Sequence, residues 1–282
     1  MSARQKITII GVGLLGGSLA LALKKKKNVE VLGWNHRASS RKKASRLLKV
    51  KSTLDEAVRN ADVVLLCSHS STILPLLKEL MLLVQPHALI MDVSSIKAQI
   101  VQSAQTVKGL EKHFVPCHPM AGKEKSGAQF ADARLYEGRY IFITPLPQNS
   151  PKLVERAISF WKSLGALPVL IDAKIHDQNV ALTSHLPHLL ASAFVQLYAT
   201  QEKRSKAISM ALGSGFKDFT RIAASNPAMW SDILEMNSAE VLKFLKQYRL
   251  QLTRLEKNLK KGKRSFWRSF FEKGRILREK LS

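Results

Sequence analysis

A glycine-rich turn close to the amino terminus limits the folds open to this chain more than any other feature. The apolar stretch Lys6–Ile10 runs into Gly11-Val12-Gly13-Leu14-Leu15-Gly16-Gly17, and an apolar helical pattern follows. In a strand–turn–helix unit, the first glycine permits the tight turn, the second lets the backbone approach a pyrophosphate, and the third lets the helix pack closely on the strand. The alternative is a glycine-rich turn without a ligand, which the flanking strand and helix disfavour.

Apolar runs alternate with helical patterns through the first half of the chain. The candidate strands are Lys6–Ile10, Val29–Gly33, Val63–Cys67, Ala88–Asp92, Phe114–Cys117, Tyr140–Thr144 and Leu167–Ile171, with helical patterns between them such as Thr72–Leu83 and Pro151–Leu164. This alternation indicates a parallel sheet covered on both faces. From about Asp172 long helical patterns follow, at Asp177–Tyr198, Ser205–Phe219 and Ser238–Leu259. We predict an α/β Rossmann domain over residues 1–172 and an all-α domain over residues 173–282.

The residues after the second strand bear on which dinucleotide binds. An NAD-binding turn usually has an acidic residue about 20 residues after the glycines, bonded to the ribose hydroxyls. Here the stretch from Trp34 to Arg41 contains no carboxylate. Arg37 and Arg41 are suited to a 2′-phosphate, so the sequence favours NADP, with NAD as the alternative. If they do not bind a phosphate, both arginines are solvated residues at the start of the next helix. The cofactor-binding residues we predict are Gly11, Gly13, Leu14, Leu15, Gly16, Asn35, His36, Arg37 and Ser68.

The charge balance is strongly basic. The chain has 45 Lys and Arg residues against 21 Asp and Glu, a formal net charge of +24. Such a field attracts anions of any kind, including nucleic acid, membrane surfaces and carboxylates. The sequence contains no recognised nucleic-acid-binding motif, so we expect a basic enzyme without a nucleic-acid or membrane partner. The alternative of a different class is a nucleic-acid-binding protein on a Rossmann scaffold, which a continuous positive stripe away from the cofactor site would favour.

Two features bear on the compartment. Cys67 and Cys117 each lie in an apolar run, as expected of buried free thiols in a reducing cytoplasm. The apolar stretch Ile7–Leu23 resembles an export signal, but it contains four glycines and ends in lysines rather than at a small-residue cleavage site. We therefore expect a cytoplasmic protein.

Three further regions are rich in chemically active side chains. They are Asp92–Lys97, His118–Gly127 and, in the helical half, Ser184–His188 with Gly215–Arg221 beyond it. In an open α/β sheet, ligands lie outside the carboxyl ends of the strands, and Ser95 and His118 both fall at such ends. His185 and His188 lack an obvious third ligand, and zinc needs at least three, so we predict no metal site.

These motifs resemble the prephenate/arogenate dehydrogenase family of tyrosine biosynthesis. The resemblance rests on the glycine turn, His118-Pro-Met-Ala-Gly, Ser184-His-Leu-Pro-His, and Gly215-Phe-Lys-Asp-Phe-Thr-Arg followed by Met229-Trp230. They occur in the family's order from Gly11 to about Trp230. The resemblance implies prephenate dehydrogenase activity, which is oxidative decarboxylation of prephenate to 4-hydroxyphenylpyruvate with NADP or NAD. Arogenate or dual-substrate cyclohexadienyl dehydrogenase activity is the alternative, although Ser126, where an arogenate-selective member would gain from an acid, favours prephenate.

The resemblance also implies roles for particular residues. His118 is expected to be the catalytic histidine, bonded to the ring hydroxyl of the substrate, and Ser95 to orient it near the nicotinamide. The residues expected around the substrate carboxylates are His188 and Arg221, with Glu124 and Asp218 in an ionic network with Arg221. These residue types suit the reaction, because removing a hydride from the carbinol carbon requires an acceptor for the hydroxyl proton, and neutral imidazole serves near pH 7.

The basic tail Lys260–Ser282 carries an apolar stripe. Phe266, Phe270, Leu277 and Leu281 fall on one helical face. The resemblance implies that the helical domain forms an intertwined homodimer, so we expect the stripe to pack there. A basic amphipathic helix on a membrane or on nucleic acid is the alternative.

Overall fold

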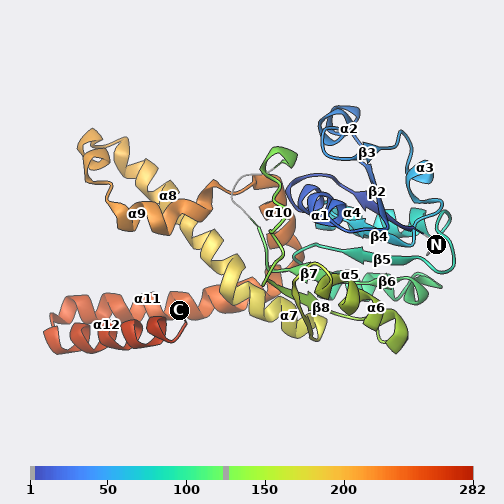
Figure 1. Ribbon diagram of the computed structural model, residues 1–282. Helices are drawn as coiled ribbons and strands as arrows, with labels where there is room; N and C mark the ends of the chain where they lie inside the picture. The colour runs from blue at the N-terminus through green and yellow to red at the C-terminus, as the bar shows by residue number, and fades with distance from the viewer. Residues whose placement is uncertain (1–3, 123–126, 282) are drawn as a thin grey trace.

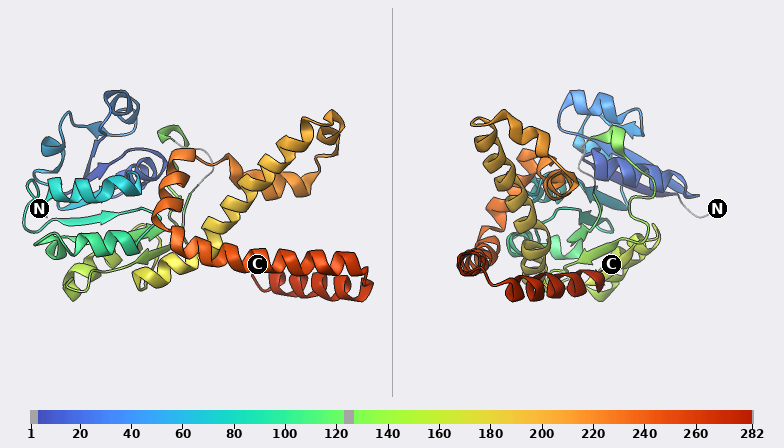
Figure 2. Two further views of the ribbon diagram at one scale, coloured as in Figure 1. Left: turned by 180° about the vertical axis from the view of Figure 1, so that it is seen from behind. Right: turned by 90° about the vertical axis from the view of Figure 1, so that its left-hand side faces the viewer.

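The computed structural model describes residues 4–122 and 127–281, and its α/β and helical parts are clearly separated (Figure 1). The last strand ends at Leu170, and only helices follow from Ala173 within the described residues. The helical part extends away from the α/β part as two arms (Figure 2). The predicted order, a Rossmann fold followed by an all-α region, is confirmed.

Six parallel strands form the main sheet, in the order β3-β2-β1-β4-β5-β6. Their bounds are β1 Gln5–Ile10, β2 Val29–Trp34, β3 Lys49–Val50, β4 Val63–Leu66, β5 Leu89–Asp92 and β6 Phe114–Val115. This order reverses direction between β1 and β4, which is where an open α/β sheet forms its ligand crevice. The edge strand β3 was not predicted, because a two-residue strand leaves almost no periodic signal.

The alternation of side chains along the strands explains why both faces of the sheet are covered. Ile7 and Ile9 pack in one core cluster, while Ile10 and Leu66 pack in the other. Both faces are covered by helices, because each face of a buried strand presents alternate apolar residues. The first face is covered by α1 Leu14–Lys24 and α6 Pro151–Lys162, and the second by α3 Leu54–Val58, α4 Ser70–Leu80 and α5 Ala98–Ala104. The remaining short helices of this part are α2 Ala38–Ala44, η1 Leu110–Lys112 and η2 Ala128–Phe130.

A proline divides the fifth predicted strand, so our prediction of one strand over Phe114–Cys117 is wrong. Pro116 has no N–H to donate, and the main sheet ends before it at β6. The chain continues as β7 Cys117–Pro119, which joins a second sheet with β8 Tyr140–Ile143 and β9 Leu167–Leu170. His118 therefore lies on the small sheet, opposite Phe142 of β8, rather than at the end of a main-sheet strand.

The helical part begins with one long, continuous helical segment, called the rod below. It comprises α7 Ala173–Val180, the π-helical turn η3 Ala181–His185 and α8 Leu186–Glu202. Pro187 accounts for the irregular turn, because its ring crowds the carbonyl four residues earlier and it cannot donate to it. The rest comprises η4 Lys206–Ala211, α9 Ser214–Thr220, η5 Arg221–Ala224, α10 Pro227–Met236, α11 Ser238–Lys261 and α12 Arg264–Glu279. The helix predicted over Ser205–Phe219 is in fact two pieces, interrupted near Gly213.

One stretch of this part, Ala173–Glu202, is long and apolar enough by length and composition to cross a membrane. Its first turns, however, carry His176 and Asp177, which are buried against the α/β part. Asp177 accepts hydrogen bonds from the backbone amides of Lys97 and Ala98, at 2.9 and 2.8 Å. That end of the rod is therefore part of the protein interior.

A buried ion pair fixes the end of β5 against β7. Lys97 and Asp92 are both fully buried, with Nζ 2.5 Å from Oδ2. Lys97 also donates to the carbonyl of Cys117 at 2.7 Å, and the other oxygen of Asp92 accepts from the Cys117 amide at 3.0 Å. The strand that carries His118 is thus held by both members of the pair.

We expect Lys97→Met to destabilise the protein strongly, because it leaves a buried carboxylate without its cation. Breaking a buried pair from one side costs about 3–5 kcal/mol. Urea unfolding measures the loss, with Lys78→Met, on the exposed face of α4, as the matched control. Equal stability of the two variants would contradict the structural role of the pair.

Candidate active site

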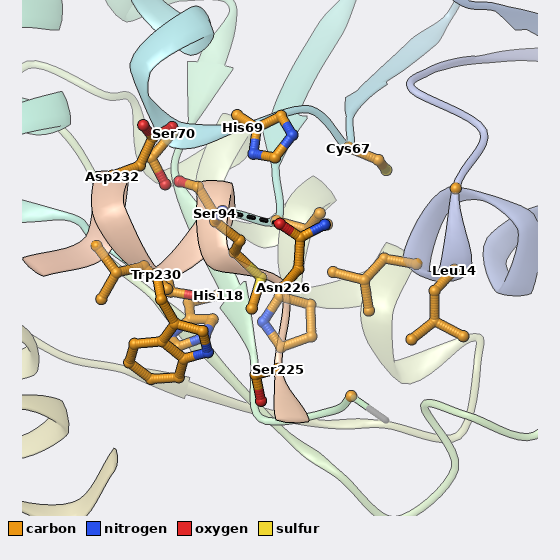
Figure 3. Close-up of a pocket in the computed structure, with 18 of the residues that line it drawn as sticks. Leu14, Cys67, His69, Ser70, Ser94, His118, Ser225, Asn226, Trp230 and Asp232 are labelled. Atoms are coloured by element: carbon orange, nitrogen blue, oxygen red, sulfur yellow. Dashed lines mark hydrogen bonds between the residues drawn. The ribbon is translucent and has the colours of Figure 1, made fainter. Parts of the chain in front are cut away.

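A cleft of about 430 Å³ lies between the two parts of the chain. The α/β part contributes the glycine turn and the loops after β4 and β5, and the helical part contributes α10 (Figure 3). Ser184 and His185 of η3 complete the lining on the helical side. Of the residues predicted for the site, the ones that line this cleft are Gly13, Leu14, Leu15, Ser68, Ser95 and His118. Residues from separate regions of the sequence are therefore brought to one space.

The three glycines of the turn differ in what surrounds them. Gly11 has a φ of +92°, and a Cβ there would lie 2.5 Å from the carbonyl oxygen of Cys67. A Cβ on Gly16 would collide with the carbonyl oxygen of Gly11, so only glycine permits the close approach of α1 to the turn. A Cβ added to Gly13 would meet no atom within 4 Å apart from its chain neighbours and its own helix backbone, which leaves room at the position where a pyrophosphate would approach.

The first turn of α1 is suited to an anion. Its N-terminus has no side-chain cap and no acidic residue, so its first N–H groups are open to a phosphate. The turn is braced from outside: Val12 N donates to Asn35 Oδ1 at 2.7 Å, and Tyr136 Oη donates to the carbonyl of Leu15 at 2.9 Å. The residues present therefore fit a dinucleotide.

The loop after β2 gives its two arginines different surroundings. Arg41 Nη1 donates to the carbonyls of Asn35 and His36, both at 2.8 Å, so it braces the loop. Arg37 and His36 are exposed. Of the two arginines, Arg37 is the one whose side chain makes no hydrogen bond within the described part of the chain.

His118 is buried at the cleft wall and is held by a second histidine. Its Nδ1 lies 2.8 Å from Nε2 of His176, and Nδ1 of His176 lies 2.7 Å from Oδ1 of Asp177. His118 Nε2 has no hydrogen bond to another described residue. Burial is the main reason that the pKa of His118 lies well below its usual value of 6.5, and the positive charge of the nearby Lys97 acts in the same direction. The imidazole is therefore unprotonated and neutral near pH 7, with a lone pair that can accept a proton.

Ser95 lies in the cleft wall but does not bond His118. Within residues 4–122 and 127–281, the partner of His118 Nδ1 is His176 rather than the serine that we expected to orient it. The neighbouring Ser94 bonds Asp92 and lies 3.1 Å from Lys97 Nζ, so it belongs to the buried pair.

The histidines of the helical part have separate roles. His185 is buried, and its Nδ1 lies 3.1 Å from Nδ2 of Asn237, which also donates to the Asp177 carbonyl at 2.9 Å. His188 bonds the carbonyl of Ser184 at 2.9 Å and stacks on Trp230, with ring centroids 3.9 Å apart. His188 does not line the cleft itself, but the indole of Trp230 on which it stacks forms part of the wall.

The remaining predicted substrate residues lie apart from this wall. Asp218 on α9 and Arg221 on η5 are exposed and do not line the cleft. Ser225 and Asn226, between η5 and α10, do line it. Glu124 lies outside the described residues, as does Ser126.

Sequence reasoning missed His176 and Asp177. The hydrogen bond between His176 and His118 joins residues 58 positions apart, so no local sequence pattern predicts it. The available signal was a His–Asp pair at the start of a helix, directly after the last strand. Among the described residues, no group of three His, Cys, Asp or Glu side chains is placed to hold a metal ion.

Known proteins similar to this chain match both of its parts. The family model described as prephenate dehydrogenase, nucleotide-binding domain, matches residues 19–170, and that described as prephenate dehydrogenase, dimerization domain, matches residues 172–273. A prephenate dehydrogenase of Lactococcus lactis subsp. cremoris is 32% identical, over 98% of this chain and 77% of the relative. A cyclohexadienyl dehydrogenase of Zymomonas mobilis subsp. mobilis is also 32% identical, over 90% of this chain and 88% of its own length.

The spatial arrangement is shared as well. The crystal structure of prephenate dehydrogenase from A. aeolicus in complex with hydroxyphenyl propionate and NAD+ superposes with a TM-score of 0.91. The two chains are 28% identical, and the match covers 99% of each.

We expect Gly13→Ala to weaken dinucleotide binding at least about tenfold, because the methyl group would occupy the space open to the pyrophosphate. Since a Cβ there would meet no atom within 4 Å apart from its chain neighbours and its own helix backbone, the melting temperature should stay within a few degrees. Fluorescence titration measures the Kd, and Gly274→Ala, at another open position on α12, is the control. Unchanged affinity would mean that the cofactor does not approach Gly13.

Stability should fall as the pH drops from about 6.5 to about 4. Burial lowers the pKa of His185 to about 4, so below 6.5 the unfolded chain takes up a proton that the folded chain does not. The loss approaches about 1.4 kcal/mol per pH unit for this group, and His118 acts in the same direction. Urea unfolding at pH 7, 6 and 5 should show a shallower dependence for His185→Gln, and equal slopes would refute this account.

Proposed function

This chain belongs to the prephenate dehydrogenase family, and from that premise we propose that it converts prephenate to 4-hydroxyphenylpyruvate by oxidative decarboxylation in tyrosine biosynthesis. It is an oxidoreductase with a nucleotide-binding domain for a nicotinamide cofactor. The observation that carries the proposal is that one cleft is lined both by the glycine turn and by His118. A hydride acceptor and a base for the hydroxyl proton would therefore share one space.

The side chains present suit the two halves of the reaction. A bound nicotinamide supplies the acceptor for the hydride. His118 Nε2 takes the proton of the ring hydroxyl as the carbinol carbon loses its hydride. Loss of carbon dioxide from the opposite ring carbon then completes the aromatic ring. The chain mainly provides position and a neutral base, and Ser95 in the same wall lies beside the reacting atoms in this proposal.

The substrate is a dianion, and the groups we assign to its carboxylates come from the helical part. We assign His188 and Arg221 to them, with Asp218 and Glu124 orienting the arginine, as the family resemblance implies; in a single chain Asp218 and Arg221 lie outside the cleft. Arginine offers a planar fork that matches a carboxylate. The structure adds Trp230, whose indole Nε1 is buried at the cleft without a hydrogen-bond partner among the described residues. A buried donor of this kind is suited to an anionic substrate.

We also propose a homodimer built from the helical arms. A single chain leaves large apolar side chains exposed along them, including Phe194, Leu197, Phe271 and Leu277. Contiguous exposed apolar surface is typical of a protein interface, and the matched domain is a dimerization domain. The predicted stripe of the tail, with Phe270 and Leu281, would be covered in the same way. Residues 1–172 would then act as the cofactor domain and residues 173–282 as the substrate and dimerisation domain, in a cytoplasmic enzyme.

A second candidate is a cyclohexadienyl dehydrogenase that also accepts arogenate. The relative of that name from Zymomonas mobilis, as similar as the prephenate dehydrogenases, favours it. Turnover of prephenate and of arogenate by one preparation separates the two activities.

We propose that NADP is preferred to NAD. The loop after β2 lacks the acid that would bond a 2′-hydroxyl, and Arg37 is exposed at the start of α2. Arg41 braces the loop carbonyls, so in this proposal Arg37 is the group that meets the 2′-phosphate.

We expect His118→Asn to lower turnover of prephenate by about 100- to 10,000-fold, the usual contribution of a general base. Cofactor affinity should stay close to that of the parent, because the glycine turn is untouched. Steady-state kinetics and a cofactor titration on the same preparation measure both quantities. Turnover like that of the parent protein would remove His118 from the mechanism.

Arg37→Ala should weaken NADP binding at least about tenfold and leave NAD binding nearly unchanged, because a charge-assisted hydrogen bond contributes about 1.5–3 kcal/mol. Lys42→Ala, another exposed cation of α2, is the control for general charge. Tighter binding of NAD than of NADP by the unaltered protein would reverse the proposed preference, and would assign the ribose contact to Asn35.

A further inference from the structure

The proton position on His118 is set by groups that the reaction itself never touches. An imidazole has two nitrogens, and in the neutral ring one donates and the other accepts. His118 uses Nδ1 for its 2.8 Å bond to His176, so only Nε2 remains for a ligand in the cleft. Whether Nε2 can act as a base therefore depends on which ring of the pair donates in that bond.

Asp177 decides the direction of the bonds behind His118. Its carboxylate accepts from two backbone amides, Lys97 N at Oδ1 (2.9 Å) and Ala98 N at Oδ2 (2.8 Å). An ionised carboxylate has no proton to give, so the 2.7 Å contact between Oδ1 and His176 Nδ1 has the imidazole as donor.

The remaining assignments follow in order along the chain of bonds. With a proton on Nδ1, neutral His176 has a lone pair on Nε2, which accepts from His118 Nδ1–H. His118 then has a bare Nε2 at the cleft. The opposite arrangement would require a positively charged His176, which is buried in the same region as Lys97 and faces Phe142 with ring centroids 5.5 Å apart.

We propose that His176, anchored by Asp177, is a positioning residue that keeps His118 in the tautomer with Nε2 bare and supports the positive charge that His118 gains during the reaction. The inference rests on the proposed role of His118 as the base. When the substrate O–H bond breaks, an N–H bond forms at His118 Nε2. The new charge is then shared through Nδ1–H with His176, whose own N–H points to a carboxylate.

The relay also crosses the junction between the two parts of the protein. His118 belongs to β7, whereas His176 and Asp177 belong to α7. Asn237, at the end of α10, donates to the Asp177 carbonyl and lies 3.1 Å from His185. The helical part therefore determines the chemical state of a side chain in the α/β part.

Two substitutions at one position separate this role from packing. His176→Phe keeps a ring that fits beside Phe142 and removes the acceptor for His118 Nδ1–H. His176→Gln restores an acceptor, because its amide oxygen takes the place of Nε2. His113→Phe is the matched control, since His113 is also buried and its ring bonds the Ala88 carbonyl at 3.0 Å, away from His118.

We expect His176→Phe to lower kcat at least about tenfold, but less than loss of the base itself, with KM and cofactor Kd within about twofold. His176→Gln should recover most of the lost kcat. His113→Phe should keep the kcat of the parent protein, even if its melting temperature falls as far as that of His176→Phe. A kcat for His176→Phe equal to that of the parent, alongside an inactive His118→Asn, would overturn the relay and leave the base role intact. An active His118→Asn would instead overturn the proposed function.

The tautomer itself can be measured without any variant. The ¹⁵N imidazole shifts of the parent protein should show His118 protonated at Nδ1 and bare at Nε2 at pH 7. The opposite tautomer would overturn the inference, and this measurement stands even if His176→Phe does not fold.

Discussion

The carboxylate of Asp177 is the point on which the arrangement of the two parts depends. It accepts both backbone amides at the start of α5, so the first helix of the second part is attached to α5 by hydrogen bonds of 2.9 and 2.8 Å. Charge-assisted bonds of this kind are about twice as strong as neutral ones, and burial keeps water from replacing them. The cleft is lined by the glycine turn on one side and by η3 and α10 on the other, and this attachment joins the two sides.

The cofactor half of the molecule could be predicted from the sequence because its rules are local. The roles predicted for Gly11, Gly13 and Gly16 follow from turn geometry within six residues, and the close contacts at Gly11 and Gly16 leave no space for a side chain at either position. The break in the strand at Pro116 was also available, since proline cannot continue a central strand, but the continuous apolar run concealed it. Arg41 shows the limit of such reasoning, because a side chain chosen for its charge bonds two nearby carbonyls instead.

The catalytic half depends on contacts between distant positions. His118 was proposed as the base because its motif is distinctive, yet the expectation that Ser95 orients it did not anticipate His176, 58 residues further on. Similarly, the Asp92–Lys97 pair lies within a stretch we singled out, but its burial and its contact with Cys117 emerge only when β5, β7 and α5 are packed together. A sequence determines such long-range contacts, but no local pattern within it identifies them.

The bonds behind His118 make its proton position depend on how the two parts of the chain pack. A hydrogen bond is lost once its atoms separate by more than a few tenths of an ångström beyond 3.2 Å. The proton position on His118 therefore tolerates little displacement of α7 relative to β7, because Nδ1 of His118 and Nε2 of His176 lie 2.8 Å apart. A substitution in the helical part that shifts α7 by more than this tolerance would disable the proposed base without altering any residue of the α/β part.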